Sequence, residues 1–348
     1  PENVEAGKPL RYSATIDILP KLEVRDFDGL PAKRPRRAIT EQDVDRSVEH
    51  LRERLAELRP VEEREQARAG DFVLIDYDAS IDGKPLPEGK RENRLVELGK
   101  GSMPPEIDAA LEGMSVGETK TVDVEFPKEY PDENVAGRSG RFVVSLRGIR
   151  QKVLPPADDE LAKEHGECAT LAELREKLRE QITQSFDRQA DEQVREQLID
   201  ELVRRNPFDV PRSLVERQVD SFIEELLTRI GEERTRLEKD AERLEKLRAE
   251  YRPSAERQVR AVLLLDAFAE QNGIDVGEDE VERRIDEMAA RAGERAARFR
   301  ELYREPDVRA ELRSRLARER ALERITAAAR IEPFDVTESV VAPTAEKG

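Results

Sequence analysis

The stretch Gly70-Asp71-Phe72-Val73-Leu74-Ile75-Asp76-Tyr77-Asp78 opens a series of short apolar segments that are separated by turn residues. An Asp-Gly turn follows at residues 82–83, and glycine turns follow at residues 99–101 and 113–117. The segments between the turns predict strands at residues 72–77, 94–98, 120–126 and 141–149, and a short helix at residues 105–111. We therefore expect residues 70–150 to form a small antiparallel β module.

The chain after this β module has a helical pattern. Past Leu154-Pro155-Pro156 the apolar period changes from two to about 3.6, and Thr170 with Glu173 has the spacing of a capping box. Asn206-Pro207 predicts a helix break. Helices are expected from residue 170 to this break and at residues 211–230, 254–271, 278–291, 295–304 and 306–329, with Gly273 closing the third of them.

The residues before the β module predict a strand and a helix. Residues 10–18 alternate apolar and polar side chains, which is typical of a half-buried strand. After a stretch rich in Pro and Arg at residues 31–37, Thr40 is expected to cap a helix that runs to about Leu58, with Ile39 and Val44 as a hydrophobic staple. We interpret this helical region as a linker.

Composition limits the classes of function. The 348 residues suffice for two or three domains, but 40% are charged and 4% are aromatic, which favours extended helices over one thick core. A net charge of −17 argues against a primary role in sequence-specific nucleic-acid binding or on an anionic membrane. The sequence contains no apolar run of the roughly 18 residues that a membrane span needs. Because Cys168 is the single cysteine, a reducing compartment, the cytoplasm, is expected.

Metal and redox chemistry have little support in the sequence. His50 and His165 lie far apart on charged segments, and no paired-carboxylate site or catalytic triad stands out. Residues 99–102, Gly-Lys-Gly-Ser, lack the spacing of a phosphate-binding loop and fit a turn after a strand. We therefore expect no cofactor and no metal.

The motifs of the β module resemble those of the FKBP type of peptidyl-prolyl isomerase, at residues 70–78, 98–101, 111–118 and 126–130. With its flanks, from about residue 10 to residue 337, the chain resembles the trigger factor family of bacterial ribosome-associated chaperones. The match includes the helix break at residues 206–211 and the apolar segment at residues 262–265. The resemblance implies an α+β multidomain fold, in which an FKBP-like antiparallel β module with a short helix precedes an extended all-α domain with projecting arms.

The resemblance also implies a division of the chain. Residues 1–32 would be a remnant of the N-terminal ribosome-binding domain, 33–62 a helical linker, 63–152 the FKBP-type isomerase domain, 153–337 the helical C-terminal chaperone domain and 338–348 a disordered tail. The family's ribosome-docking loop, Gly-Phe-Arg-x-Gly-Lys-x-Pro, does not occur in this sequence. We therefore expect the loop to lie upstream of Pro1, and we expect this chain, as a fragment, to bind ribosomes poorly.

An isomerase site needs shape and low polarity more than reactive groups. The barrier to rotation about an X-Pro bond is the partial double bond of the amide, roughly 18–20 kcal/mol, and an apolar pocket stabilises the twisted form. By resemblance, the residues of this pocket are Tyr77, Leu86, Pro104, Ile107, Tyr130 and Phe142. The alternative is that the aromatic residues among them are ordinary core residues of a small barrel.

Several of these positions depart from the FKBP pattern. Leu86-Pro87 stands where the family has Phe and an acidic residue, and Arg94 stands where it has a pocket Phe. Residues 104–108 lack the large aromatic side chain that forms the pocket floor in the family. We therefore expect an isomerase activity that is reduced relative to the family.

The resemblance to chaperones implies that unfolded or nascent polypeptides are the partners, with the ribosome reached through the N-terminal domain. Weak apolar contacts surrounded by charge suit such loose binding. The candidate substrate-binding residues are Phe222, Ile223, Leu226 and Leu227 on one arm, and Met288, Phe299, Leu302 and Tyr303 on the other. The alternative for each is packing against a neighbouring helix.

Other classes of protein stay open at this point. Residues 234–251 could form a coiled coil of a structural scaffold, although the segment spans few heptads. A free-standing isomerase whose helices form a homodimer is a second alternative. A periplasmic chaperone-isomerase is a third, and the order of the domains favours trigger factor over it.

Overall fold

The computed structural model describes residues 18, 20–127, 135–166, 168–231, 237 and 240–336. Ile39–Thr183 form one compact unit, and the second consists of Pro1–Ala38 with Gln184–Gly348. We refer to the described part of the second as the helical unit. Except for Ile18, the strand expected at residues 10–18 lies outside the described residues, as does the tail at residues 338–348. Within the described part, no helix is long and apolar enough to cross a membrane.

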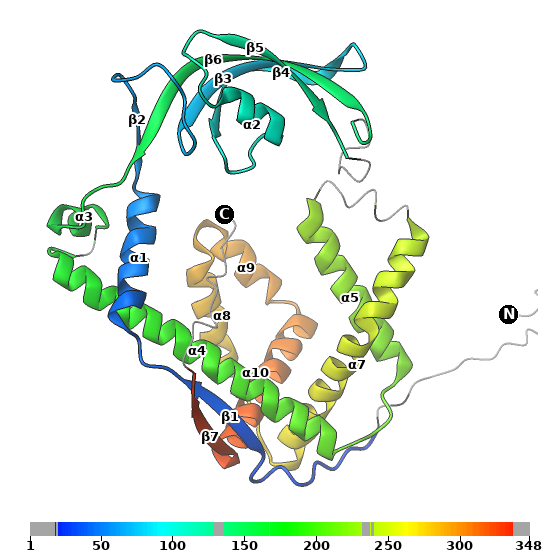
Figure 1. Ribbon diagram of the computed structural model, residues 1–348. Coiled ribbons are helices and arrows are strands. Elements are labelled where there is room, and N and C mark those ends of the chain that lie inside the picture. Colours follow the sequence, from blue (N-terminus) through cyan, green and yellow to red (C-terminus); the bar gives the residue numbers. More distant parts are fainter. Residues whose placement is uncertain are drawn as a thin grey trace, which may run out of the picture. The chain divides into compact units, whose positions relative to one another are not determined.

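The β module is a five-stranded antiparallel sheet that curves around a short helix, α2 (Figure 1). Strands β6 and β3 pair along most of their length, β4 extends the sheet beyond β3, and β2 and β5 pair with opposite ends of β6. The bounds are β2 (Glu57–Pro60), β3 (Phe72–Ile81), β4 (Lys84–Glu97), α2 (Pro105–Leu111), β5 (Thr119–Glu125) and β6 (Ser139–Val153). The four predicted strands and the helix are confirmed, and β3, β4 and β6 are longer than the sequence indicated.

Local signals set the turns of this sheet. Asp82 and Gly83 both have positive φ angles, 49° and 78°, as a type I′ hairpin turn between β3 and β4 requires. Along β3 the side chains of Val73, Ile75 and Ala79 are buried beneath the sheet. With α2 and the inner faces of β4 to β6 they form one core cluster.

Helix α1 (Glu41–Arg54) precedes the module and is capped as expected. Thr40 and Asp43 form a capping box, in which the Asp43 carboxylate accepts the Thr40 backbone N–H at 2.9 Å. The expectation that α1 runs to Leu58 is wrong, because residues 57–60 pair with β6 as strand β2. Residues 33–62 are therefore not a purely helical linker. Helix α1 packs against α3 (Asp159–Glu164) and the start of α4 (Leu171–Arg205) through a small apolar cluster.

The helical unit contains a two-stranded parallel sheet that the sequence reasoning missed. Strand β1 (Pro31–Arg36) pairs with β7 (Arg330–Asp335), near the other end of the chain. Each strand contains proline, which lacks an N–H and is therefore uncommon inside sheets. The other side of β1 is held by Gln197 of α4, whose amide accepts the Lys33 N–H at 2.9 Å and donates to the Lys33 carbonyl at 2.9 Å.

Two further side-chain amides hold the backbone before β1 in the same way. Asn206 bonds both backbone groups of Arg25, at 2.9 and 3.1 Å, and Gln271 bonds both backbone groups of Val24, at 3.1 and 3.3 Å. Because these contacts use main-chain atoms, they fix the path of this segment with little dependence on its side chains. The segment also contributes Val24 and Leu30 to the core of the helical unit.

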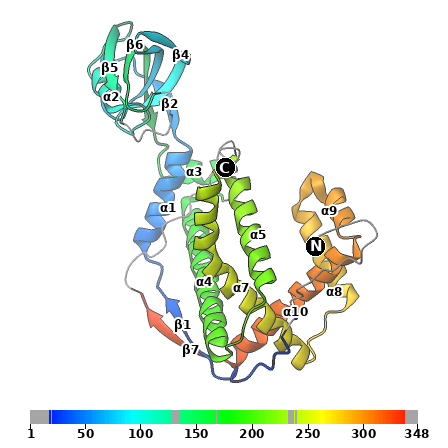
Figure 2. The ribbon, with the colours of Figure 1, turned by 90° about the vertical axis from the view of Figure 1, so that its right-hand side faces the viewer.

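Two groups of helices complete the helical unit. Helices α5 (Arg212–Ile230) and α7 (Ala241–Gln271) lie side by side in both views (Figures 1 and 2). The other group contains α8 (Glu278–Arg291), the short 3₁₀ turn η2 (Gly293–Arg295), α9 (Ala296–Leu302) and α10 (Pro306–Ala328). The break after Asn206 is confirmed, as is the closure of α7 at Gly273, where φ is +59° and the Ile274 N–H reaches the Ala269 carbonyl at 2.9 Å.

The start of α7 corrects one expectation. The sequence predicted a helix from residue 254, after Pro253, but the helix begins at Ala241 and contains that proline. A proline inside a helix costs roughly 3 kcal/mol. Apolar side chains on both sides of it, Leu247 and Tyr251 before and Ala255 after, pack in the cluster between α5 and α7. We infer that this burial offsets the local cost.

Candidate functional site

The β module carries an aromatic cluster on three strands. The Phe142 ring on β6 lies 6.2 Å from the Tyr77 ring on β3 and 6.3 Å from the ring of Phe126, just after β5, measured between centroids. Leu86 on β4 and Ile107 on α2 belong to the same apolar cluster. The fold thus brings four residues of the predicted pocket, Tyr77, Leu86, Ile107 and Phe142, into one region.

These side chains differ in accessibility. Ile107 is fully buried and Phe142 is 7% exposed, so both contribute mainly to the core, whereas Tyr77 and Leu86 are half-buried. Pro104 is the N-cap of α2, and its carbonyl accepts the Ile107 N–H at 2.9 Å. Tyr130 lies outside the described residues.

Sequence reasoning missed two residues of this cluster, Met103 and Phe126. Met103 is 7% exposed and lies just before α2 in sequence. Phe126 continues the alternation of Val122 and Val124, which pack against the same core. That alternation could have identified it.

Arg94 lies against the exposed side of this cluster. Its guanidinium donates a hydrogen bond from Nη1 to the Tyr77 hydroxyl at 2.9 Å, and its Cζ lies 5.7 Å from the centroid of the Tyr77 ring. The second distance is within the range of a cation–π contact. A cation therefore stands beside the aromatic cluster, at the position where the FKBP pattern has a Phe.

An ionic contact network holds the strand beside Arg94. The Asp76 carboxylate accepts the Asn93 backbone N–H at 2.7 Å and a hydrogen bond from Arg147 at 2.6 Å. The hydrogen bond from Asn93, and then that from Arg147, lower the pKa of Asp76. Asp76 is therefore ionised at neutral pH, which strengthens both hydrogen bonds.

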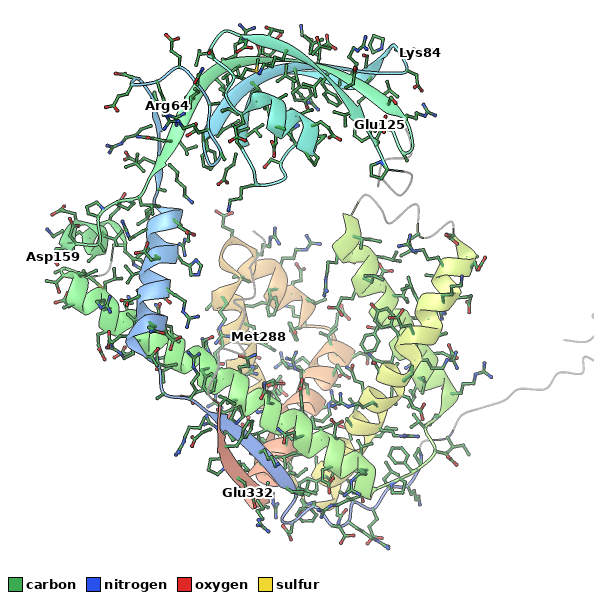
Figure 3. All side chains as sticks on the ribbon, in the orientation of Figure 1. Arg64, Lys84, Glu125, Asp159, Met288 and Glu332 are labelled. Carbon is green, nitrogen blue, oxygen red and sulfur yellow. The ribbon has the colours of Figure 1, made fainter. Side chains whose placement is uncertain are left out.

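A second carboxylate, Asp71, ties the start of β3 to the loop before it. Asp71 is 6% exposed and pairs with Arg64, whose Nη1 lies 2.6 Å from Asp71 Oδ2, while the Arg68 N–H donates to the same oxygen at 2.7 Å. Figure 3 shows Arg64 at one end of the sheet and Lys84 with Glu125 at the other. Burial by itself would raise the pKa of Asp71, but the hydrogen bonds from Arg64 and Arg68 outweigh it and lower the pKa.

A shallow pocket of about 510 Å³ lies elsewhere on the module, at the outer ends of β3, β5 and β6. Its lining is largely polar and includes Ser80, Asp123 and Arg141, with an ion pair between the last two at 2.8 Å. None of the predicted pocket residues that the structure describes lines it. Within the described residues, no group of three or more His, Cys, Asp or Glu side chains could hold a metal ion.

The candidate client-binding residues of α5 face α7. Ile223 and Leu227 are 5% and 6% exposed, and Phe222 and Leu226 pack against the same cluster, with the Phe222 ring 5.8 Å from that of Tyr251. The four residues therefore serve first to join the two helices. Phe222 and Leu226 are half-buried, so part of each side chain remains accessible.

The candidate residues of α8 and α9 are more accessible. Leu302 is 55% exposed, and helix α9 has no buried residue. The rings of Phe299 and Tyr303 lie 5.0 Å apart, and Tyr303 packs against the cluster between α8 and α10. Met288, labelled in Figure 3, is half-buried on α8. We call Phe299, Leu302 and Tyr303 the α9 patch.

The fold and the aromatic cluster define a peptidyl-prolyl isomerase module of the FKBP type, joined to an extended helical region. Residues 63–147 match the family model described as FKBP-type peptidyl-prolyl cis-trans isomerase. Residues 170–327 match the model described as bacterial trigger factor protein C-terminus, and residues 1–51 match the model described as bacterial trigger factor protein. A segment related to the N-terminal part of that family is thus present in this chain.

Individual relatives agree with the family models. Trigger factor of Geobacter metallireducens is 35% identical over 302 residues, which are 87% of this chain and 70% of the relative. Trigger factor of Moorella thermoacetica is 36% identical over 290 residues, which are 82% of this chain and 65% of the relative. A solved structure titled "Promiscuous Substrate Recognition in Folding and Assembly Activities of the Trigger Factor Chaperone" is 26% identical, with a TM-score of 0.46, and the match covers 82% of this chain and 67% of that one. The chain belongs to the trigger factor family, chaperones with an FKBP-type isomerase domain, and this decides against the scaffold alternative.

Proposed function

We propose that the chain holds unfolded polypeptides, including nascent ones, on small apolar surfaces of its helical unit, while its β module isomerises X-Pro bonds weakly. The observation that carries the proposed binding of unfolded polypeptides is the α9 patch, where Leu302 is 55% exposed beside the Phe299 and Tyr303 rings. Because helix α9 has no buried residue, Leu302 can contact a client without leaving a core. The surrounding charge keeps the protein dispersed.

The proposal extends to the ribosome and to the cytoplasm. The match of residues 1–51 to the N-terminal trigger factor model supports ribosome docking through the N-terminal domain, while the absence of the family's docking loop from this sequence means that this chain should itself bind ribosomes poorly. Nascent chains are the polypeptides that a protein docked there would meet first. A chaperone of this kind would work in the cytoplasm, where ribosomes release their products.

The proposed isomerase activity of the β module is based on its aromatic cluster. Tyr77 and Leu86 offer a half-buried apolar surface above a floor of Ile107 and Phe142, on which a proline ring can pack and its amide lose water. The Tyr77 hydroxyl accepts a hydrogen bond from Arg94 and can still donate its own hydrogen. The activity is reduced because Arg94 and Ile107 replace larger aromatic walls.

We expect Leu302→Asp to raise the concentration of chaperone needed for half-maximal suppression of client aggregation about fivefold. Burying the exposed part of a Leu side chain contributes roughly 1 kcal/mol, which the substitution removes. The measurement is light scattering of an unfolded client that is diluted into buffer with the full chain. Val116→Asp, at a 46% exposed position of the β module, is the matched control. Equal losses in both variants, or no loss in Leu302→Asp, would contradict the role of the α9 patch.

We expect Arg94→Phe to raise kcat/KM for a Leu-Pro tetrapeptide about tenfold. The substitution replaces a hydrated cation by an apolar wall, which improves desolvation of the amide in the transition state. The measurement is the rate of cis-to-trans conversion, and the slow phase of refolding of a proline-limited protein gives a second readout. A wild-type rate that already equals or exceeds that of the variant would show that the pocket is not weakened at this position.

A further inference from the structure

We propose that Arg94 makes the β module selective for prolyl peptides with an acidic residue next to the proline. The inference rests on the proposed isomerase function and names the class of substrate that the site prefers. It is carried by the position of Arg94 on β4, beside a backbone bulge, and by the contacts of its guanidinium.

A β-bulge directly precedes Arg94 on β4. In the pairing of β3 with β4, Arg94 lies opposite Ile75 and Arg91 lies opposite Tyr77. Between these pairs, β4 has two residues, Glu92 and Asn93, against one on β3. Bulges of this kind bend a strand and redirect the side chains beside them.

The bulge is fixed by hydrogen bonds and does not depend on Arg94. Asn93 has a φ angle of +56°, in the left-handed region that Asn adopts more readily than most residues. Its N–H donates to Asp76 at 2.7 Å, and Arg147 holds the same carboxylate at 2.6 Å. The backbone on the N-terminal side of Arg94 is therefore anchored to β3, and substitution of the Arg94 side chain should leave the bulge in place.

The guanidinium of Arg94 keeps donors available for a ligand. Within the described part of the chain, its side chain makes one hydrogen bond, to the neutral Tyr77 hydroxyl, and has no carboxylate within ion-pair distance. A guanidinium has five N–H donors in a planar arrangement that matches a carboxylate. Because Arg94 is exposed, its remaining donors face solvent, where a peptide carboxylate can accept two hydrogen bonds.

The distances decide which part of a peptide Arg94 would contact. A proline that packs on Tyr77 and Leu86 lies next to the guanidinium, which is 5.7 Å from the Tyr77 ring centroid, so a side chain adjacent to the proline is within reach. The net charge of −17 repels acidic peptides in general. That repulsion is screened beyond about 10 Å at 0.1 M salt, so the nearest cation determines the preference of the site.

The experiment compares tetrapeptides that differ only in the residue before proline: Glu, Gln, Leu or Lys. Using the full chain, we expect kcat/KM for Glu-Pro to exceed that for its neutral isostere Gln-Pro about fivefold at about 0.1 M salt, and less at about 1 M salt. Arg94→Gln should bring the Glu/Gln ratio to about 1, and Arg94→Glu should make Lys-Pro the better substrate. Because each ratio is measured within one variant, a partial loss of folded protein cancels.

Lys152→Gln is the matched control, since it removes one positive charge from the same sheet near the end of β6 that pairs with β2. It should keep the wild-type Glu/Gln ratio. Equal rates for Glu-Pro and Gln-Pro in an active wild type, or a ratio that survives Arg94→Gln, would overturn this inference and leave the isomerase function standing. Failure of every peptide to be isomerised would overturn the isomerase function, and this inference with it.

Discussion

Asp71→Asn is expected to destabilise the β module by about 3 kcal/mol. Removing one partner of a buried ion pair leaves the other charge uncompensated, which typically costs roughly 3–5 kcal/mol. The lower figure applies because the Arg64 side chain is 20% exposed and can regain some water. Asp71 also positions the loop before β3, since it accepts the Arg68 N–H through its carboxylate, and its backbone carbonyl accepts the Leu98 N–H at 2.9 Å.

Hydrogen exchange of the β3 and β4 amides is the suitable measurement, because a chain of two compact units need not unfold in one step. Asp123→Asn, which breaks the exposed pair with Arg141, is the control and should change the opening free energy by less than about 0.5 kcal/mol. A similar small change for Asp71→Asn would show that the Arg64 contact stabilises little.

The same pair predicts how the stability of the module depends on pH. Asp71 has a lowered pKa in the folded protein, so its contribution is fully present above the unfolded value of about 3.8. It is lost as the pH falls through the still lower folded pKa. Wild type and Asp71→Asn should therefore differ most above about pH 4 and converge in stronger acid.

Phe268→Ala is expected to have the largest effect on stability, a loss of about 4 kcal/mol in the helical unit. Phe268 is fully buried, and its ring lies edge-on to that of Phe27 with the centroids 4.8 Å apart. Phe-to-Ala substitutions in cores cost roughly 3–5 kcal/mol through lost transfer energy and the remaining cavity. Because Phe268 is surrounded by other core side chains, these side chains can move little to fill the cavity that the substitution leaves.

Loss of Phe268 should also loosen the segment that crosses this core. Val24 and Leu30 belong to the same cluster as Phe268, so their amides should exchange faster in the variant. Phe334→Ala removes the same side chain at a position that is 42% exposed and should cost less than about 1 kcal/mol. Unchanged exchange at Val24 in Phe268→Ala would show that the Gln271 amide alone holds this segment.

Much of the β module could be predicted because its signals are local. Asp82-Gly83 can form only a few kinds of turn, and the alternation of β3 assigns Val73, Ile75 and Ala79 to one face. The bounds of α2 and α8 match the expected ranges, 105–111 and 278–291, since Pro at the first position and a Gly N-cap mark their starts.

The candidate site could be predicted only in part. The spacing of the module and its resemblance to FKBP isomerases located Tyr77, Leu86, Ile107 and Phe142, which the fold brings together. Ile107 and Phe142 are buried, whereas Tyr77 and Leu86 are half-buried. The sequence could not make this distinction, because burial depends on contacts with residues distant in sequence. For the same reason Ile223 and Leu227, candidates for client contact, face α7, whereas Leu302 remains exposed.

The sequence by itself determined four strands of the β module, its turns and most helix limits, since these follow from residue types and spacings within about ten positions. Its motifs indicated the family by resemblance. Only the tertiary structure decided the pairing of β1 with β7, the continuation of α7 through Pro253 and the placement of Arg94 over Tyr77. The physical reason is the same in each case. Contacts between residues that are distant in sequence stabilise these arrangements by more than the local preferences of Pro and Arg destabilise them. A local sequence pattern gives no information about such contacts.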